Sequence, residues 1–363
     1  MSEWKCYKLN DISSLSNGIN FDKSAYTSGV KLIGVSDFKN RIHPDYDSLQ
    51  EVDSKVVKSG DYLEKGDIVF VRSNGNKELV GRCMMIDRDI PVTYSGFCIK
   101  LRLKDKKIFD PVFFNYLFKT RQFKKSMTGT AVGANIQNLS QSRLGSCEVN
   151  VPDIEIQKKI ATILSRYDSL IENYQKQIKL LEEAAQRLYK EWFVDHHFPG
   201  HENTKIVDGV PEGWEEKSIS EVFDFKYGKI LPTKDFVEDG PIPVYGASKQ
   251  IGRYTKANCF EPKVLIGSRG NAGFVHRTIE DETYVTNNSF IVEPCAKYGY
   301  LKLPFIFESF KVLDFVAICT GAAQPQLTLN SISSLKYIVP IKDLIVRYCG
   351  ITTCYFNPLA ELI

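Results

Sequence analysis

The chain has 363 residues, of which 43% are hydrophobic and 25% charged, as is typical of a globular protein with two or three domains. It contains no apolar run of about 18 residues or more and no apolar signal core near its start, so we expect a cytoplasmic protein without a membrane span. The nine cysteines are scattered without a Cys-x-x-Cys pair, which argues against disulfides and a zinc site. The net charge of +3 allows nucleic-acid binding but does not indicate it.

The basic residues are concentrated in the first part of the chain. Residues 1–150 hold 23 Lys and Arg against 17 Asp and Glu, whereas residues 151–195 hold 7 against 8 and residues 196–363 hold 17 against 19. This excess fits either the solvated faces of a strand and a helix or a patch that contacts phosphates. The basic residues in question are Lys100, Arg102, Lys104, Lys106, Lys107, Lys119, Arg121, Lys124 and Lys125.

Four short segments recur in the same order, each pair aligned without gaps and separated by about 190 to 210 residues. The pairs are WKCYKLNDI (4–12) with WEEKSISEV (214–222), VFVRSNGN (69–76) with VLIGSRGN (264–271), TGTA (128–131) with TGAA (320–323), and NLSQSRLGSCEVNVP (138–152) with QLTLNSISSLKYIVP (326–340). We therefore predict a duplicated domain, in residues 1–152 and 214–340. Because each copy mixes apolar strands with a helical segment, at about 111–126 and 300–316, each is expected to be a mixed α/β (α+β) globule.

Residues 153–195, between the two copies, contain neither Gly nor Pro, and Pro152 precedes them. Their apolar positions recur at alternating steps of four and three, which is the seam of a coiled coil rather than the wider stripe of a core helix. Some 40 helical residues would span roughly 60 Å. The seam positions are Ile160, Leu164, Tyr167, Ile171, Tyr174, Ile178, Leu181, Ala185, Leu188 and Trp192.

A linker and a second helix are expected after this spacer. Residues 196–213 are polar and rich in Gly, Pro and His, which is typical of a linker. Residues 341–363 start a second seam, which Gly350 and Pro358 interrupt before the chain ends, so we expect a truncated second spacer helix.

The sequence contains no convincing catalytic set. It lacks the [DNS]-P-P-[YFW] motif, a P-loop and a G-x-S-x-G elbow, and the spacing of Gly267, Gly270 and Gly273 does not match a dinucleotide loop. Asp53 and Lys55 resemble part of a nuclease site, but this short pattern is more typical of a solvated loop. The histidines of residues 196–201 lack other ligands at metal-binding spacing. We therefore expect a recognition protein without catalytic residues or a metal.

The run VNVPDIEIQKKIATIL, with LIENYQKQIKLLEEAAQRLYKEWFVDHHFPGHE and VPEGWE after it, resembles the central conserved region of type I restriction–modification specificity subunits. The two halves resemble the target-recognition domains of that family, and the resemblance covers nearly the whole chain. Its most specific parts are Pro152, Gln157 and Ile160, the LYKEWF end of the helix, and the later FPG and PEGW. The family's Glu-Gln pair is Ile156-Gln157 here, and the second copy, PIKDLIVRY, lacks the glutamine.

The resemblance implies a non-catalytic subunit that binds double-stranded DNA at a bipartite, asymmetric site. Two modification subunits would dock on the conserved helices and methylate adenine with S-adenosylmethionine, and restriction subunits using ATP and Mg would join them. The chain itself would hold no cofactor. The spacer helix would fix the gap between half-sites, within two turns of B-DNA at about 34 Å per turn. Its expected partner-binding positions are Gln157 and the seam residues Ile160, Leu164, Tyr167, Ile171, Tyr174, Ile178, Leu181, Leu188 and Trp192.

DNA contacts are expected from loops at the ends of the repeated strands, because Arg can bind guanine and Asn or Gln can bind adenine. The glycines of residues 264–273 would let the backbone approach DNA closely, and the arginine takes a different place in the two copies. The candidates are Arg72, Asn74, Asn76, Lys77 and Arg82 in the first copy and Ser268, Arg269, Asn271, His276, Asn287, Asn288, Gln324 and Gln326 in the second.

Four alternatives remain open at this point. The chain could be a fragment of a self-contained restriction enzyme or methyltransferase, which the missing motifs disfavour, or an adaptor whose seam binds another helix rather than DNA. The missing part of the second helix could come from a second copy of the chain or from another polypeptide. The gene could also be a broken or recombined allele with impaired activity.

Overall fold

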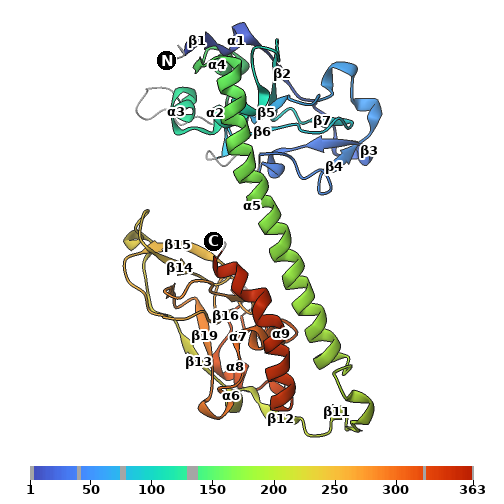
Figure 1. The fold of residues 1–363 in the computed structure, drawn as a ribbon, viewed down its shortest axis with the longest axis vertical. Helices are drawn as coiled ribbons and strands as arrows, with labels where there is room; N and C mark the ends of the chain where they lie inside the picture. The colour runs from blue at the N-terminus through green and yellow to red at the C-terminus, as the bar shows by residue number, and fades with distance from the viewer. Residues whose placement is uncertain (1–3, 39–41, 74–78, 129–137, 322–323, 362–363) are drawn as a thin grey trace. The chain divides into compact units, whose positions relative to one another are not determined.

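The computed structural model describes residues 4–38, 42–73, 79–128, 138–321 and 324–361, and for residue 128 and residues 354–361 it describes the backbone alone. The chain forms two compact units, residues 1–171 and residues 172–363, and the boundary falls inside one long helix (Figure 1). Within these described ranges, none of the helices is both long and apolar enough to cross a membrane.

The first unit is built from three small sheets and a group of helices. Its antiparallel four-stranded sheet has the order β2-β8-β5-β6, a three-stranded sheet has the order β4-β3-β7, and β1 pairs with β9. The elements are β1 (Lys5–Lys8), α1 (Leu9–Ile12), β2 (Ser13–Asn17), β3 (Tyr26–Ile33), β4 (Gln50–Val52), β5 (Ile68–Val71), β6 (Cys83–Met85), β7 (Val92–Tyr94), β8 (Cys98–Leu103), α2 (Pro111–Lys119), α3 (Arg121–Thr128), α4 (Gln141–Gly145), β9 (Glu148–Val151) and the start of α5 (Ile154–Tyr189).

The second unit repeats this topology strand for strand. Its four-stranded sheet has the order β13-β19-β16-β17, its three-stranded sheet has the order β15-β14-β18, and β12 pairs with β20. The elements are β10 (Ile206–Val207), β11 (Val210–Pro211), β12 (Glu215–Ser218), α6 (Ile219–Val222), β13 (Phe223–Tyr227), β14 (Ile242–Tyr245), β15 (Gln250–Tyr254), β16 (Val264–Gly267), β17 (Val275–Arg277), β18 (Tyr284–Val285), β19 (Ser289–Pro294), α7 (Leu303–Lys311), α8 (Leu329–Ser333), β20 (Lys336–Val339) and α9 (Lys342–Glu361).

The match extends to strand direction. In both units one strand of the three-stranded sheet pairs in parallel, β3 with β7 and β14 with β18, while every pair of the four-stranded sheet is antiparallel. The same strand order with the same mixed directions is the arrangement expected of a duplicated domain. The mixed α/β class and the duplication predicted from sequence are therefore confirmed.

The central strands are apolar at every position because both of their faces are covered. In β5, Ile68 and Phe70 join the cluster that includes Phe114 of α2, whereas Val69 and Val71 join the opposite cluster around Tyr94. Strand β16 does the same in the second unit. This two-sided burial explains why both strands appear in the sequence as continuous apolar runs rather than alternating ones.

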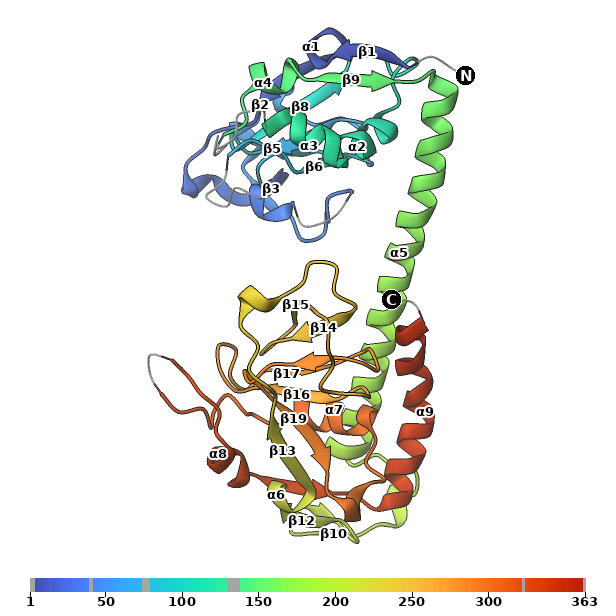
Figure 2. The ribbon, with the colours of Figure 1, turned by 90° about the vertical axis from the view of Figure 1, so that its left-hand side faces the viewer.

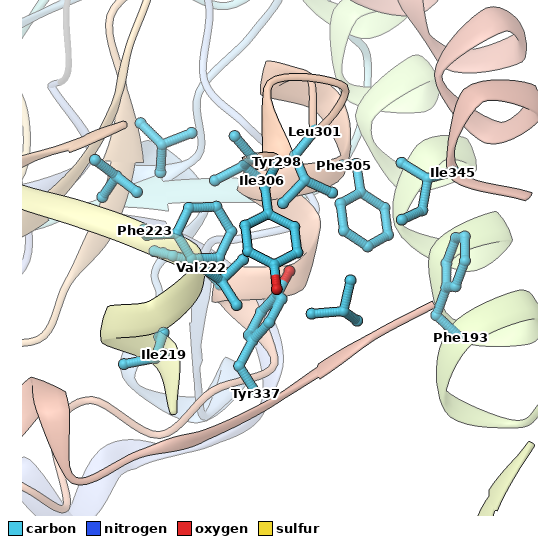
Figure 3. Packing of buried hydrophobic residues seen from close by; sticks show 14 of the residues in the cluster. Phe193, Ile219, Val222, Phe223, Tyr298, Leu301, Phe305, Ile306, Tyr337 and Ile345 are labelled. Carbon is cyan, nitrogen blue, oxygen red and sulfur yellow. The ribbon is translucent and has the colours of Figure 1, made fainter. Parts of the chain in front are cut away.

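The main core of the second unit extends from the sheet to the helices. Phe305 of α7 packs edge to face against Phe193, with ring centroids 5.1 Å apart, and both belong to one cluster with Ile345 of α9 (Figure 3). Tyr337 of β20 enters the same cluster, and its hydroxyl hydrogen-bonds the Ser309 hydroxyl at 2.9 Å. Tyr189, the last residue of α5, belongs to the same cluster, so the end of α5 is part of this core.

The predicted long spacer helix is confirmed as α5, which continues into a π-helical turn at Lys190–Val194 (Figure 2). Near its end, the Tyr348 hydroxyl of α9 donates a hydrogen bond to the Ala185 carbonyl at 3.1 Å. The second helix is unbroken over Lys342–Glu361, so Gly350 and Pro358 do not interrupt its backbone. Packing of buried Tyr348 and its neighbours outweighs the cost of a helical glycine, which is about 1 kcal/mol.

Candidate nucleic-acid interface

The glycine-rich segment after β16 is a tight loop that presents two polar side chains to solvent. Gly270 and Gly273 both have φ +82, and a Cβ at Gly267 would lie 2.1 Å from the Asn271 carbonyl oxygen. These positions require glycine. Between them Arg269 and Asn271 are exposed, and Asn271 Nδ2 donates to Ser248 Oγ at 2.6 Å.

Three loops of the second unit meet at this point. The Ser268 amide donates to the Asn288 carbonyl at 2.7 Å, and the Leu327 amide donates to the Ser268 carbonyl at 3.0 Å. Arg269 also forms an isolated β-bridge with Gln326. The structure therefore brings together six of the predicted residues from three separate segments, namely Arg269, Asn271, Asn287, Asn288, Gln324 and Gln326, of which Asn287 and Gln326 are half-buried and the others exposed.

Two candidates of the second copy lie inside the unit. Ser268 is 1% exposed, and its hydroxyl donates to the Asn287 carbonyl at 3.3 Å. His276 of β17 is also buried, and desolvation lowers its pKa to about 4, against a weaker opposing effect of a hydrogen bond with the Gly246 backbone. Both predictions of direct DNA contact are therefore corrected, because these side chains support the loops from within.

The candidates of the first copy are only partly described. Asn74, Asn76 and Lys77 lie outside the described residues. Arg72 is half-buried and its Nη1 donates to the Gly96 carbonyl at 3.3 Å, which ties it to the turn before β8. Arg82 is half-buried, and its carbonyl accepts from the Val71 amide at 2.9 Å.

Backbone hydrogen bonds correct the alignment of the two loops by one residue. The Arg72 amide donates to the Phe97 carbonyl at 2.8 Å, as the Ser268 amide does to the Asn288 carbonyl at 2.7 Å. Arg72 is thus equivalent to Ser268, whereas the gapless sequence match places it on Gly267. The gapless match of residue types therefore gave the wrong register. Equivalent positions are defined by the backbone hydrogen bonds between paired strands and not by the loop sequence.

The basic residues on and after β8 are used within the first unit. Lys100 is buried and its Nζ donates to the Gly60 carbonyl at 3.0 Å, while Arg102 binds Asp67 through two hydrogen bonds of 2.7 and 2.8 Å. Lys104 Nζ bonds the carbonyls of residues 10 and 11. Lys106 and Lys119 likewise donate to the carbonyls of Lys65 and Cys83. Contact with phosphate stays a prediction for the other exposed basic residues, which are Lys107 and, on α3, Arg121, Lys124 and Lys125.

Some residues of the spacer helix pack inside the units, and the others are half-buried or exposed. Gln157 is 1% exposed and its side chain bonds three backbone groups, so its predicted role in partner binding is corrected to a structural one. Ala185 and Trp192 are buried beside Tyr348, and Leu188 packs on the same core. The remaining seam positions are half-buried or exposed, namely Ile160, Leu164, Tyr167, Ile171, Tyr174, Ile178 and Leu181.

The residues that resemble a nuclease or metal site have structural roles. Asp53 Oδ1 accepts a hydrogen bond from the Lys55 amide at 2.9 Å and caps a short 3-10 helix. The His196 ring packs edge to face on Trp214 at 5.3 Å. Across the described ranges, no group of three or more His, Cys, Asp or Glu side chains could hold a metal ion.

Two residues that the sequence did not indicate contact these loops. They are Phe97 in the first unit and Ser248 in the second. Phe97 is 61% exposed, and its carbonyl accepts hydrogen bonds from both Arg72 and Ser73. Contacts between segments distant in sequence bring these residues to the loops, so no local sequence signal could have indicated them.

The geometry defines a protein with two copies of one mixed α/β domain and a long helix between them in the chain. A sequence profile of the type I restriction modification DNA specificity domain matches residues 1–183 and 211–345, and the chain belongs to this family. It is 35% identical over 271 residues to the specificity subunit of the type I restriction enzyme MjaIX of Methanocaldococcus jannaschii, covering 67% of this chain and 62% of that protein.

Further relatives agree in family and in fold. The chain is 30% identical over 202 residues to the HindI specificity subunit of Haemophilus influenzae, which covers 54% of this chain and 42% of that protein. The chain thus spans less than two thirds of the length of these curated relatives. The crystal structure of the type I restriction–modification S subunit from M. genitalium matches with a TM-score of 0.61 at 20% identity, over 99% of this chain and 91% of that one, which shows a shared fold.

Proposed function

We propose that this chain is the DNA sequence-specificity subunit of a type I restriction–modification complex, in which each unit contacts one half of a bipartite, asymmetric target. One observation supports this most directly. The same backbone hydrogen bonds hold Arg72 and Ser73 after β5 and Ser268 and Arg269 after β16, but the residue types at these equivalent positions differ. A duplicated scaffold with unlike side chains at equivalent positions is suited to reading two unlike half-sites.

The loop cluster of the second unit offers the chemistry that base recognition needs. Arg269 can donate two hydrogen bonds to guanine, and the side chain of Asn271 or Asn288 can pair with adenine in the major groove. Their backbones are fixed by hydrogen bonds to neighbouring loops, so binding would order few additional residues.

Catalysis would be supplied by partner subunits. Modification subunits with S-adenosylmethionine would methylate adenine, and restriction subunits with ATP and Mg would cleave DNA. The exposed apolar side chains of α5, including Leu164, Tyr167 and Ile171, are the surface we propose for docking a partner.

The proposal is tested by coexpressing the chain with a modification subunit and mapping methyladenine by single-molecule sequencing. We expect one asymmetric motif in two parts, separated by a fixed gap. Methylation without sequence preference, or methyl transfer by the purified chain alone, would contradict the proposal.

Variants of the loop then test the site. Arg269→Ala and Asn271→Ala should each relax the preference in the same half of the motif, by about 1–3 kcal/mol of discrimination. Lys336→Ala is the matched control, because this exposed lysine of the same unit pairs with Glu216 between β20 and β12, outside the three loops. A motif that is unchanged in both loop variants would remove these residues from the site.

A further inference from the structure

An exposed aromatic side chain lies in the turn before β8 of the first unit, beside the loop that begins at Arg72. Phe97 is 61% exposed although its chain neighbours Gly96 and Cys98 are buried, and the ring of Tyr94 three residues earlier is fully buried. An exposed ring on this otherwise buried segment adds little to the stability of the core. Its position therefore suggests a role in binding.

The backbone that carries Phe97 is held rigidly. The Cys98 amide donates to the Ser95 carbonyl at 2.9 Å and closes a four-residue turn, and the Gly96 amide donates to the Ile19 carbonyl at 2.7 Å. A Cβ at Gly96 would lie 2.1 Å from Asn20 Oδ1, so the turn fits tightly against the neighbouring loop. A ring on such a turn loses little freedom when it is covered.

The second unit has the same turn with a different residue. The Ser289 amide donates to the Thr286 carbonyl at 3.1 Å, and the Asn288 carbonyl accepts from the two residues of the glycine-rich loop that correspond to Arg72 and Ser73. Asn288 is therefore equivalent to Phe97, and both side chains are exposed. One position of the repeated fold thus presents an apolar ring in one unit and an amide in the other.

Resting on the proposed function, we infer that this turn position is a specificity-determining site of each unit. Phe97 makes an apolar contact with the bases of one half-site, either on a thymine methyl group or by stacking on an unstacked base step. Asn288 makes a hydrogen-bonded contact with the other half-site. The pair therefore contributes to the asymmetry of the target.

Exchange of the two residues is the most direct test, carried out in the complex with the modification subunit. Phe97→Ala should reduce methylation of the native target about tenfold or more and relax only one half of the motif. Phe97→Asn should change the preferred base in that half, and Asn288→Phe should do so in the other half. Ile108→Ala is the control, because Ile108 is a half-exposed apolar residue of the same unit outside the loop cluster.

A second readout does not depend on methylation. A photo-crosslinking phenylalanine analogue at position 97 should crosslink to bases of one half-site, and the same analogue at position 108 should not. The inference is overturned if Phe97→Ala keeps the wild-type motif and rate, or if position 97 gives no crosslink to target DNA. If the wild-type complex shows no motif at all, the proposed function fails instead. Phe97→Ala and Phe97→Leu should both retain the wild-type melting temperature, which excludes misfolding as the cause.

Discussion

The side-chain oxygen Oε1 of Gln157 accepts a hydrogen bond from the backbone N–H of Asp110 at 2.9 Å. Gln157 Nε2 donates to the carbonyls of Ile108, at 3.0 Å, and Pro152, at 2.8 Å. One buried amide thus joins the start of α5 to the start of α2. In the second unit the equivalent position is Ile345, which packs in the apolar core, so the two copies secure the same junction by different means.

Replacement of Gln157 by leucine should destabilise the first unit. The change leaves the Asp110 amide and the two carbonyls without their partner, and each unpaired buried group costs about 1–3 kcal/mol. We expect the free energy of unfolding to fall by at least about 2 kcal/mol, with faster hydrogen exchange at the Asp110 amide. Lys158→Ala, the adjacent exposed position, is the control. Equal exchange in the two variants would contradict a structural role for Gln157.

The two four-stranded sheets each hold an ion pair at equivalent positions, but the acidic and the basic residue are exchanged between the units. We expect the two pairs to contribute differently to the free energy of unfolding. Arg102 Nη2 lies 2.7 Å from Asp67 Oδ2 in the first unit, and Asp67 is fully buried. At the same positions of the second unit, Glu293 Oε1 lies 3.0 Å from Lys263 Nζ, and the Glu293 side chain is 31% exposed. Arg102→Met should cost about 3–5 kcal/mol because it leaves Asp67 charged and buried.

The corresponding change in the second unit should be milder. Glu293→Gln should cost less than about 1 kcal/mol, because Lys263 keeps Glu261 and the site is partly solvated. Urea denaturation of the two variants, followed by probes in each unit, makes the comparison. Equal losses of unfolding free energy in the two variants would show that the burial of Asp67 does not determine how much its ion pair contributes to stability.

Acid should weaken the second unit through His276. Burial lowers the pKa of this imidazole from 6.5 to about 4, so the unfolded chain takes up the proton before the folded one does. The stabilisation is therefore present above pH 6.5 and is lost as the pH falls toward 4. The loss amounts to about 3 kcal/mol.

The measurement compares the wild type with His276→Gln at pH 7.5 and 4.5. The variant should lose less stability on acidification than the wild type does. Glu308 has a pKa raised by burial and so acts in the opposite direction, which is why the difference between the two proteins is informative. Identical pH profiles would exclude His276 as the source of the acid sensitivity.

Replacement by alanine should have opposite effects on stability at two glycines. Gly350 lies within α9, and among the described residues no atom comes within 4 Å of a Cβ placed there, so Gly350→Ala should stabilise by about 0.5–1 kcal/mol. Gly273 has φ +82, and a Cβ there would lie 2.8 Å from the Val316 amide nitrogen. Gly273→Ala should destabilise by about 1 kcal/mol or more. Melting temperatures shifted in the same direction would contradict this reading.

Much of the architecture can be predicted from the sequence because it depends on local pattern. The unbroken steps of four and three predict α5, the apolar runs predict the buried strands β5 and β16, and the matched segments predict the duplication. The glycines and polar residues that follow the apolar run of residues 264–266 predict a loop. Each of these features follows from side-chain periodicity or backbone freedom within a few residues.

The tertiary structure alone decides which polar side chains are available for binding. Gln157, Ser268 and His276 look like exposed candidates in the sequence, yet strands and helices far away in the chain bury them. The same long-range pairing places Arg72 opposite Phe97 and Ser268 opposite Asn288, which corrects the register of the repeat. Burial and hydrogen-bond partners depend on segments distant in sequence, and for that reason local pattern does not determine them.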